Sequence, residues 1–399
     1  MVIAVICEYN PFHKGHEYHL ASIRREFGED TGIVAIMSGN YTQRAELAIL
    51  PKSYRAKTAV ECGADLVLEL PFPYSASSAE LFASAGVHIA DMLGCVDVIS
   101  FGTESGNLDD LYEAEEIIDS DEYKRAFSSI PESKFLGYPE RCEAAFRAVS
   151  GSGFDFTPNN ILAVEYLRAL RSRGSRIKPH TIKREGSGYN DGTVNTEAFS
   201  SAKAIRTSII ENGLSSINDS LPEATRKELA LALELGDFPT DERRLDTSVI
   251  TKFRLSPRMQ NVSYHDASDG LYNRLRSASF EANDISSLLL QSHAKNYTKA
   301  RIRRAMWNVF FGVTSSDVKR APCFTQVLAM NKRGMQILKS VKKRDDFFIL
   351  TKPSGTKVLT ESALKQKQLS DIADSVFELS KPVAKSGNSS YRFTPYIKK

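Results

Sequence analysis

The stretch that decides the fold is residues 2–20, which read Val2-Ile3-Ala4-Val5-Ile6-Cys7-Glu8-Tyr9-Asn10-Pro11-Phe12-His13-Lys14-Gly15-His16-Glu17-Tyr18-His19-Leu20. Residues 2–7 are apolar, which is typical of a strand buried on both faces of a parallel sheet. Pro11 pushes Asn10 into an extended conformation and so ends the strand, and a helix is expected from Gly15 to about Phe27. A buried strand that runs through a turn into a helix N-terminus is how α/β proteins build a nucleotide site.

The residues that follow repeat this alternation of strand and helix. Strands are expected at 32–37, 65–71 and 96–101, with helices over 52–62 and up to Gly94 between them. A short strand at 177–184 contains Pro179, which favours the edge of a sheet. The pattern predicts an α/β fold, a Rossmann-like doubly wound parallel sheet, over residues 1–212. After Asn212-Gly213 the pattern becomes mainly helical, so residues 213–399 are predicted to form a second, basic region.

The bulk composition indicates a globular protein. Hydrophobic residues make up 42% of the 399 residues and charged residues 25%, which is ordinary for a folded soluble chain. No apolar run reaches the ~18 residues that a membrane helix needs, and no signal peptide is expected before the first strand. Five well-separated cysteines without a C-x-x-C pair predict reduced thiols, a cytoplasmic location and no zinc ribbon. No stable protein partner is implied.

Charge divides the chain into two halves. Residues 1–210 hold 21 Lys and Arg against 29 Asp and Glu, a net charge of −8. Residues 211–399 hold 31 against 20, a net charge of +11. An acidic first half and a basic second half suggest a catalytic module joined to one that binds a polyanion.

The residues His13-Lys14-Gly15-His16 carry the strongest chemical signal. Two imidazoles at a helix start can stabilise the charge that develops on an α-phosphate and on a departing pyrophosphate, and Gly15 lets the phosphates approach the backbone. This H-x-G-H signature resembles the HIGH-type nucleotidyltransferase superfamily. The histidines could instead bind a metal, but His13, His16 and His19 spread over roughly 120° of a helix and no carboxylate is placed as in H-E-x-x-H, so no metal site is expected.

A second element at residues 200–206 is expected to close the phosphate site. The run Ser200-Ser201 with Ile205-Arg206 is similar to the S-S-x-x-I-R element of the same superfamily, in which a helix N-terminus, hydroxyls and an arginine hold the β- and γ-phosphates. The alternative is a simple N-capped helix with a surface arginine. The candidate catalytic residues are His13, Lys14, His16 and Arg206.

Longer motifs resemble the bacterial tRNA(Met) cytidine acetate ligase family over most of the chain. The matching segments are residues 8–20, Met37-Ser38-Gly39, Gln43-Arg44, residues 63–71, Phe101-Gly102-Thr103-Glu104, Pro158-Asn159-Asn160-Ile161-Leu162, Ile182-Lys183-Arg184, Asp269-Gly270-Leu271, Asn273-Arg274, Tyr297-Thr298, Ala300-Arg301-Ile302 and Arg304. The chain departs from the family pattern at Ala45, at Asn296 and over residues 327–331.

The resemblance implies an ATP-dependent ligase that makes acetyl-adenylate and pyrophosphate from acetate and ATP. It then acetylates N4 of the wobble cytidine of elongator tRNA(Met) and releases AMP. The implied ATP-binding residues are Ile6, Cys7, Glu8, Tyr9, Asn10, Pro11, Phe12, His13, Lys14, Gly15, His16, Glu17, Tyr18, His19, Gly102, Asn159 or Asn160, and Arg184, with Ser200 and Ser201 on the outer phosphates. Mg²⁺ is expected to bind largely through those phosphates.

A basic segment in the second half is the candidate RNA-binding element. Its members are Lys295, Tyr297, Lys299, Arg301, Arg303 and Arg304. Outward-facing cations suit an RNA backbone, and the tyrosine can stack on a base. The alternative is a solvated basic helix.

Two other functions are compatible with parts of this pattern. The chain could be an adenylyltransferase that acts on a small phosphorylated cofactor precursor, although this leaves the basic half unexplained. It could also be a non-catalytic RNA-binding protein with a vestigial nucleotide site.

Overall fold

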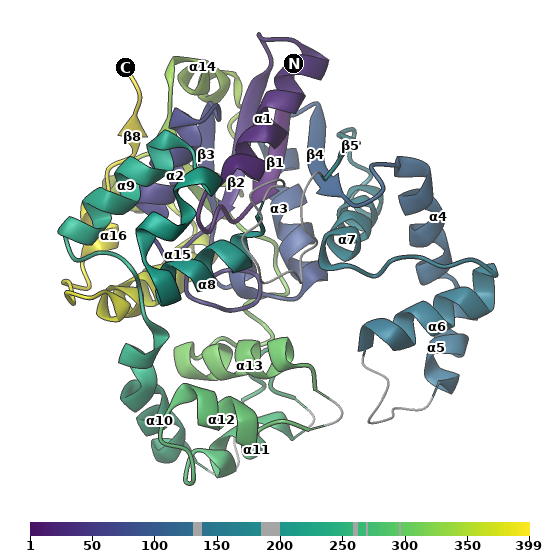
Figure 1. Cartoon of the computed structure of the whole chain (residues 1–399), viewed down its shortest axis with the longest axis vertical. Coiled ribbons are helices and arrows are strands. Elements are labelled where there is room, and N and C mark those ends of the chain that lie inside the picture. The colour runs from purple at the N-terminus through teal and green to yellow at the C-terminus, as the bar shows by residue number, and fades with distance from the viewer. Residues whose placement is uncertain (131–137, 185–199, 258–261, 269, 295–296) are drawn as a thin grey trace.

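The computed structural model describes residues 1–130, 138–184, 200–257, 262–268, 270–294 and 297–399 (Figure 1). The strands are β1 (Val2–Cys7), β2 (Gly32–Ser38), β3 (Leu66–Leu70), β4 (Val98–Thr103), β5 (Lys178–Lys183), β6 (Phe324–Met330), β7 (Phe348–Leu350) and β8 (Tyr396–Ile397). The α-helices are α1 (Lys14–Phe27), α2 (Lys52–Glu61), α3 (Ala79–Leu93), α4 (Leu108–Asp119), α5 (Asp121–Ser129), α6 (Tyr138–Ser150), α7 (Pro158–Ser172), α8 (Ala202–Asn212), α9 (Glu223–Glu234), α10 (Asp246–Leu255), α11 (Leu271–Ala278), α12 (Ile285–Gln291), α13 (Lys299–Phe311), α14 (Lys332–Ser340), α15 (Glu361–Phe377) and α16 (Ser389–Arg392).

The predicted doubly wound parallel sheet is confirmed. Its parallel part has the strand order β5-β4-β1-β2-β3, and β1 pairs with β2 in register from Val2↔Gly32 to Cys7↔Met37. The strand with Pro179 is at one end of this order, as the proline indicated. The chain builds outward from β1 to β3 and then returns to β4 on the other side of β1. Ligands of such sheets bind at the carboxyl ends of the strands at this switch point, where the histidine motif follows β1.

The alternation of side chains along β1 explains the two helical layers. Ile3 and Val5 share one core cluster with Leu20 and Ile23 of α1 and with residues of α2. Ala4 belongs to the opposite cluster, which is filled by α3 and α7. Because both faces are covered, β1 is apolar at every position, and the end of the strand is fixed between two packed layers.

The sheet extends beyond the predicted boundary at residue 212. β6 pairs antiparallel with β3, through Leu66↔Met330 and Val67↔Ala329, and β7 and β8 pair with β6. Residues 324–397 therefore add three strands to the sheet that the first half begins. The division into residues 1–212 and 213–399 stays a prediction about function, because the core is continuous across it.

A helical body lies below the sheet in Figure 1 and consists of α10, α11, α12 and α13. Its core includes the fully buried Trp307, whose ring centroid is 5.5 Å from that of Tyr41, a residue that follows β2. Phe72 and Phe377 belong to the same cluster. This body is thus packed against the loops at the carboxyl ends of the strands. Among the described helices, none has the length and apolar character needed to span a membrane.

Candidate active site at the end of the first strand

The site begins where β1 turns into α1, at the switch point of the sheet. Tyr9 has a backbone φ of 47°, a left-handed conformation that costs free energy for a residue with a Cβ. Two distant segments hold the next residue. Arg206 Nη1 donates to the Asn10 carbonyl oxygen at 2.9 Å, across 196 residues of sequence, and the Ile49 N–H donates to Asn10 Oδ1 at 2.9 Å. The strained turn is therefore fixed by tertiary contacts.

His13 and His16 form a capping box at the start of α1. The Gly15 N–H donates to His13 Nδ1 at 3.1 Å, and the His13 N–H donates to His16 Nδ1 at 3.3 Å. A neutral imidazole carries one proton, so a ring that accepts at Nδ1 carries it on Nε2. The helix cap therefore gives each histidine an Nε2–H donor for a ligand.

Both histidines are held in the neutral form. Burial, and then the charges of Arg184 and Arg206, lower the pKa of His13 to about 3. Burial also lowers the pKa of His16, with smaller effects of His13, Arg184 and His19. The two rings stack with their centroids 3.7 Å apart. Two imidazolium ions at this distance would repel each other. Two neutral donors beside two guanidinium groups suit the oxygens of a polyphosphate.

Arg184 forms the side of the site that faces β4. Its backbone N–H donates to the Thr103 carbonyl oxygen at 2.9 Å, and its side chain crosses Gly102, where a Cβ would lie 3.1 Å from Arg184 Cγ. Its charge acts on His13, His16 and His19. The structure thus places Arg184 near the histidine motif and Gly102 against the Arg184 side chain, and their role in ATP binding stays a prediction.

Asn159 and Asn160 lie at the start of α7, next to Glu104. Asn159 Nδ2 donates to Glu104 Oε1 at 2.9 Å, and the Glu104 N–H donates to Asn160 Oδ1 at 3.3 Å. Asn160 Nδ2 also donates to the Asp155 carbonyl oxygen at 2.9 Å, so both ends of the buried Asn160 amide support the turn. Asn159 stays the better candidate for contact with a nucleotide.

The element at residues 200–206 is brought to the motif chiefly by Arg206. Ser201 caps α8 by accepting from the Ala204 N–H at 3.1 Å, and Ser200 accepts from Ser220 Oγ at 3.3 Å. Both serines are buried. Their predicted role toward the outer phosphates stays a prediction, whereas Arg206 contacts the turn directly.

The remaining predicted nucleotide residues differ in exposure. Ile6 packs toward α3, where a Cβ on Gly86 would lie 2.6 Å from Ile6 Cδ1. Burial raises the pKa of the Cys7 thiol. Lys14, in the first turn of α1, is exposed. Of these three residues, Lys14 alone has an exposed side chain.

Sequence analysis missed Arg55, a fully buried residue of α2. Its guanidinium donates to the carbonyl oxygens of Glu8 at 2.6 Å, Ser38 at 3.2 Å and Leu50 at 2.8 Å, and to that of Gly39. It therefore ties the carboxyl ends of β1 and β2 together. The signal that could have revealed it is an arginine on the apolar stripe of its own helix.

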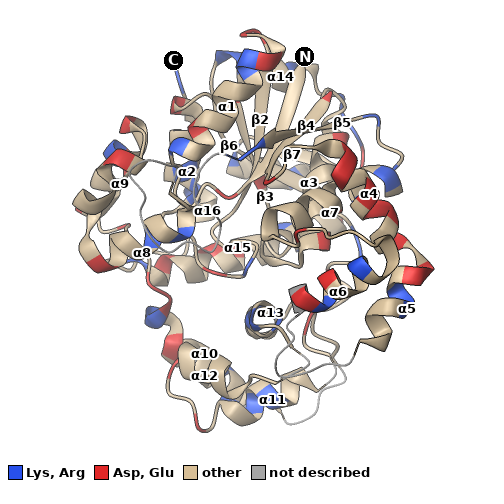
Figure 2. Cartoon of the chain, turned by 45° about the vertical axis from the view of Figure 1, so that its right-hand side comes forward, with Lys and Arg blue, Asp and Glu red and all other residues tan. Residues whose placement is uncertain are grey.

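Of the predicted RNA-binding residues, Lys299, Arg301, Arg303 and Arg304 lie at the start of α13 and Tyr297 lies just before it, and Figure 2 shows this helix with basic residues at its near end. Arg303 Nη1 contacts both Glu242 carboxylate oxygens at 2.6 Å, and Arg304 Nε donates to Asp266 Oδ2 at 2.7 Å. Arg301 contacts Ser268 Oγ at 3.0 Å and lies 5.2 Å from the centre of the Tyr297 ring. Lys299 is exposed. Lys295 and the departure at Asn296 lie outside the described residues.

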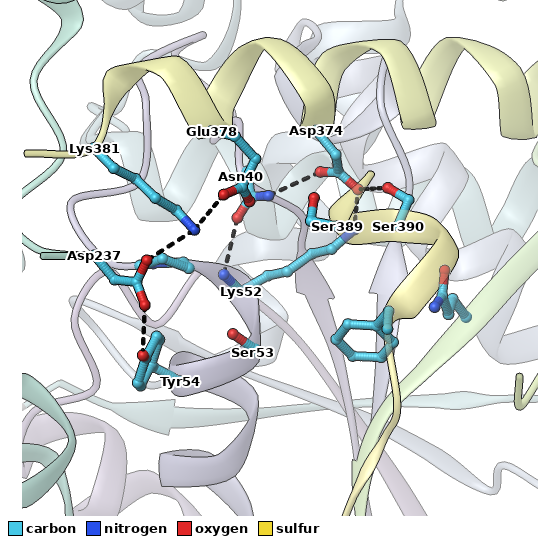
Figure 3. A pocket seen from close by; sticks show the side chains of 13 residues that line it. Asn40, Lys52, Ser53, Tyr54, Asp237, Asp374, Glu378, Lys381, Ser389 and Ser390 are labelled. Carbon is cyan, nitrogen blue, oxygen red and sulfur yellow. Dashed lines mark hydrogen bonds and ion pairs between the residues drawn. The ribbon is translucent and has the colours of Figure 1, made fainter. Parts of the chain in front are cut away.

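A separate pocket of about 210 Å³ lies at the start of α2 and does not include the histidine motif (Figure 3). Lys52 Nζ lies 2.6 Å from both Glu69 Oε1 and Asp374 Oδ2. Asn40 Nδ2 donates to Asp374 Oδ1 at 2.8 Å. On the other wall, Lys381 pairs with Asp237 and Glu378, as the dashed lines in Figure 3 show. The Lys52–Asp374 pair connects α15 to α2, and the Lys52–Glu69 pair connects α2 to β3.

Comparisons with known proteins agree with this geometry. The family model described as HIGH Nucleotidyl Transferase matches residues 1–390. A tRNA(Met) cytidine acetate ligase of Thermoanaerobacter sp. (strain X514) is 34% identical over 92% of this chain and 93% of its own length. The enzyme of that name from Acetivibrio thermocellus is 35% identical over 92% and 91%.

Two crystal structures of Thermotoga maritima TmcAL also match, each over 99% of both chains. The apo form has a TM-score of 0.89 and 29% identity. The form bound with alpha-thio ATP has a TM-score of 0.86 and 30% identity. The similarity thus includes the helical body and the late strands as well as the histidine motif.

Proposed function

This chain belongs to the HIGH nucleotidyl transferase family and to the tRNA(Met) cytidine acetate ligases, and from that membership we propose that it acetylates a tRNA with ATP and acetate. The observation that carries the proposal is the capping box of α1, which presents His13 and His16 as two neutral Nε2–H donors next to Arg184 and Arg206. Donors and charges in this arrangement favour ATP with its phosphates at the helix start.

In the first proposed step, an acetate oxygen attacks the α-phosphorus of ATP. The bond from that phosphorus to the bridging oxygen of the β-phosphate breaks, and pyrophosphate leaves. Negative charge grows on the oxygens around the α-phosphorus and on the bridging oxygen. The two Nε2–H groups and the Arg206 guanidinium are held by hydrogen bonds before the reaction, so they stabilise this charge without reorganisation, and the charge of Arg184 adds to theirs. The product, acetyl-adenylate, is an anhydride with a good leaving group.

In the second proposed step, N4 of the wobble cytidine of elongator tRNA(Met) attacks the acetyl carbon. The bond from that carbon to the AMP oxygen breaks, AMP leaves, and N4 loses one proton. The cytidine amine is a weak nucleophile because its lone pair is delocalised into the ring, which explains the need for an activated acyl donor. This route uses no covalent intermediate on the protein.

Mg²⁺ is proposed to arrive with the phosphates of ATP. His13, His16, Arg184 and Arg206 offer imidazole and guanidinium groups, which bind phosphate oxygens, whereas Mg²⁺ prefers oxygen ligands. Held by the phosphates, the ion would neutralise part of their charge. No residue of the chain is assigned to it.

The proposal is tested by incubating the protein with ATP, isotopically labelled acetate and tRNA. We expect AMP, pyrophosphate and labelled N4-acetylcytidine, detected by mass spectrometry of the tRNA nucleosides. Pyrophosphate release that depends on a small phosphorylated acceptor and not on acetate or tRNA would instead support the adenylyltransferase alternative. No turnover of ATP in any mixture would exclude both enzymes.

The basic start of α13 is proposed to contact the tRNA backbone, and Lys299→Glu tests this. Lys299 is exposed, so its reversal should weaken tRNA binding without disturbing the core. We expect KM for tRNA to rise by about tenfold and the salt dependence of binding to fall by about one phosphate contact. Acetate-dependent pyrophosphate exchange should not change.

The matched control for this prediction is Lys332→Glu on α14, which reverses an exposed lysine on another helix. An equal rise in KM for tRNA in both variants would indicate an effect of net charge and not of α13. Arg303→Glu is unsuitable, because it would place two carboxylates together at Glu242.

A further inference from the structure

Four polar side chains form a continuous chain across the face of the sheet that α1 covers. Ser100 Oγ lies 2.9 Å from His19 Nε2 and 3.1 Å from His180 Nδ1, and His180 Nε2 lies 3.1 Å from Glu26 Oε1. Ser100 of β4 and His180 of β5 are register partners, so their side chains lie side by side. The chain of contacts begins in the last turn of α1, at Glu26, and returns to the same helix at His19, three residues after His16.

This chain of contacts connects solvent with the interior of the site. The side chain of Glu26 is 56% exposed and that of His180 is 14% exposed, whereas Ser100 is fully buried. Phe27 packs edge-on against the His180 ring, with the centroids 4.9 Å apart, and so holds the ring in position. A proton that binds near the surface can therefore affect His19 through a continuous series of hydrogen bonds.

The positions of the available protons decide which atom donates and which accepts in each of these hydrogen bonds. A carboxylate only accepts, so the contact with Glu26 requires a proton on His180 Nε2. In a neutral His180 ring, Nδ1 is then an acceptor, and the single hydroxyl proton of Ser100 points to it. The contact with His19 is a hydrogen bond only if His19 Nε2 carries a proton and donates to Ser100 Oγ. His19 is then the Nε2–H tautomer, and its Nδ1 is an acceptor.

A second proton on His180 reverses this direction. Nδ1 of the imidazolium then donates to Ser100 Oγ, and the hydroxyl proton turns to His19 Nε2. A neutral His19 must respond by carrying its proton on Nδ1. Binding of one proton to His180 thus exchanges the donor and acceptor nitrogens of the His19 ring. The His19 ring stays uncharged in both states.

We propose that Glu26, His180 and Ser100 are positioning residues that set the tautomer of His19 and thereby the hydrogen-bonding pattern that a nucleotide meets beside His16. The proposal rests on the proposed function only in naming that nucleotide. The charged and titratable groups that act on His19 are His180, Arg184 and His16. Burial, and then the charges of His180 and Arg184, lower the pKa of His19 to about 4, so near neutral pH the His19 ring is uncharged and only its tautomer can change.

The test is nuclear magnetic resonance of the full chain labelled with ¹⁵N in histidine, recorded over a pH series. Two-bond couplings between ring protons and ring nitrogens report the tautomer of each histidine. In the unaltered protein, we expect His19 to change from the Nε2–H to the Nδ1–H tautomer in step with uptake of the second proton by His180. A His19 tautomer that stays constant while His180 is protonated would overturn the proposal.

Substitutions at Ser100 separate coupling from simple packing. In Ser100→Ala, His180 should still titrate while the His19 tautomer no longer follows it, and Ser100→Thr, which keeps a hydroxyl, should restore the coupling. His88 is an internal control, because its Nε2 lies 3.0 Å from the Pro322 carbonyl oxygen and its tautomer should be the same in every variant. Coupling that persists in Ser100→Ala would overturn the proposal.

Enzyme kinetics give a second readout that is independent of the spectrum. Loss of one ordered hydrogen bond corresponds to about a fivefold effect, so we expect Ser100→Ala to raise KM for ATP by about fivefold with little change in kcat, and Ser100→Thr to reverse this. A fall in kcat with an unchanged KM for ATP would contradict a positioning role. Absence of all activity would refute the proposed function and leave the spectroscopic result to decide the inference.

Discussion

His16→Ala is expected to reduce the rate of acetate-dependent pyrophosphate exchange by about 10²- to 10³-fold, which is the typical cost of one preorganised donor. The substitution removes an Nε2–H group that a half-buried, neutral ring directs from the start of α1. It also removes the ring that stacks on His13 at 3.7 Å. The effect should appear mainly in kcat, because the donor acts most strongly on charge that develops in the transition state.

Exchange of labelled pyrophosphate into ATP measures this step without acetyl transfer. His16→Asn is the informative partner variant, since its amide can accept from the His13 N–H and keep part of the helix cap. Lys227→Ala on α9 is the control for an unrelated exposed position. Wild-type exchange in His16→Ala, with the protein folded as judged by its thermal midpoint, would mean that the motif does not act in adenylation.

Lys52→Met is expected to lower the free energy of unfolding by about 3–5 kcal/mol, the usual cost of leaving buried charges without their partner. Burial opposes the charge of Lys52, but Asp374 and Glu69 outweigh it and hold its pKa above the ordinary value. Both carboxylates lie 2.6 Å from its ammonium group. Without the lysine, two carboxylates would share a buried space near β3 and α15.

Urea denaturation at neutral pH measures this loss. The double variant Lys52→Met/Asp374→Asn should regain part of the stability, because it removes one of the two uncompensated charges. Lys124→Met breaks a pair with Asp121 whose side chains are 62% and 86% exposed, and its unfolding midpoint should not move, since exposed pairs contribute little. Equal midpoints for Lys52→Met and the unaltered chain would show that the buried network does not stabilise the fold.

The parallel part of the sheet could be predicted because each strand has a local signal. β1 and β2 are apolar on both faces, with Pro11 shortly after β1 and Ser38-Gly39 at the end of β2, and the edge position of β5 follows from Pro179. The sequence of β6 has no such local signal for its position in the sheet. It pairs with β3 across more than half of the chain, and nothing local in either strand specifies that partner. The predicted boundary at residue 212 therefore does not mark the end of the sheet.

The site shows the same division between local and tertiary information. The cap formed by His13 and His16 is encoded within four residues, so the motif was sufficient to locate it. The contacts of Arg55, and the series of hydrogen bonds from Glu26 to His19, depend on which helices and strands become neighbours. This information is not present in any short segment. The family resemblance supplied Gly102 and Arg184, which spacing alone could not have selected.

The late arrival of β6 has a consequence during protein synthesis. Leu66 of β3 is synthesised about 260 residues before its pairing partner Met330. At ribosomal speeds this interval lasts roughly 10 to 50 s. Over that interval the nascent chain exposes an unpaired, apolar strand edge, which is a template for aggregation. We therefore expect emerging chains to depend on a chaperone that shields this edge, and fragments that stop before β6 to precipitate even though they contain the whole histidine motif.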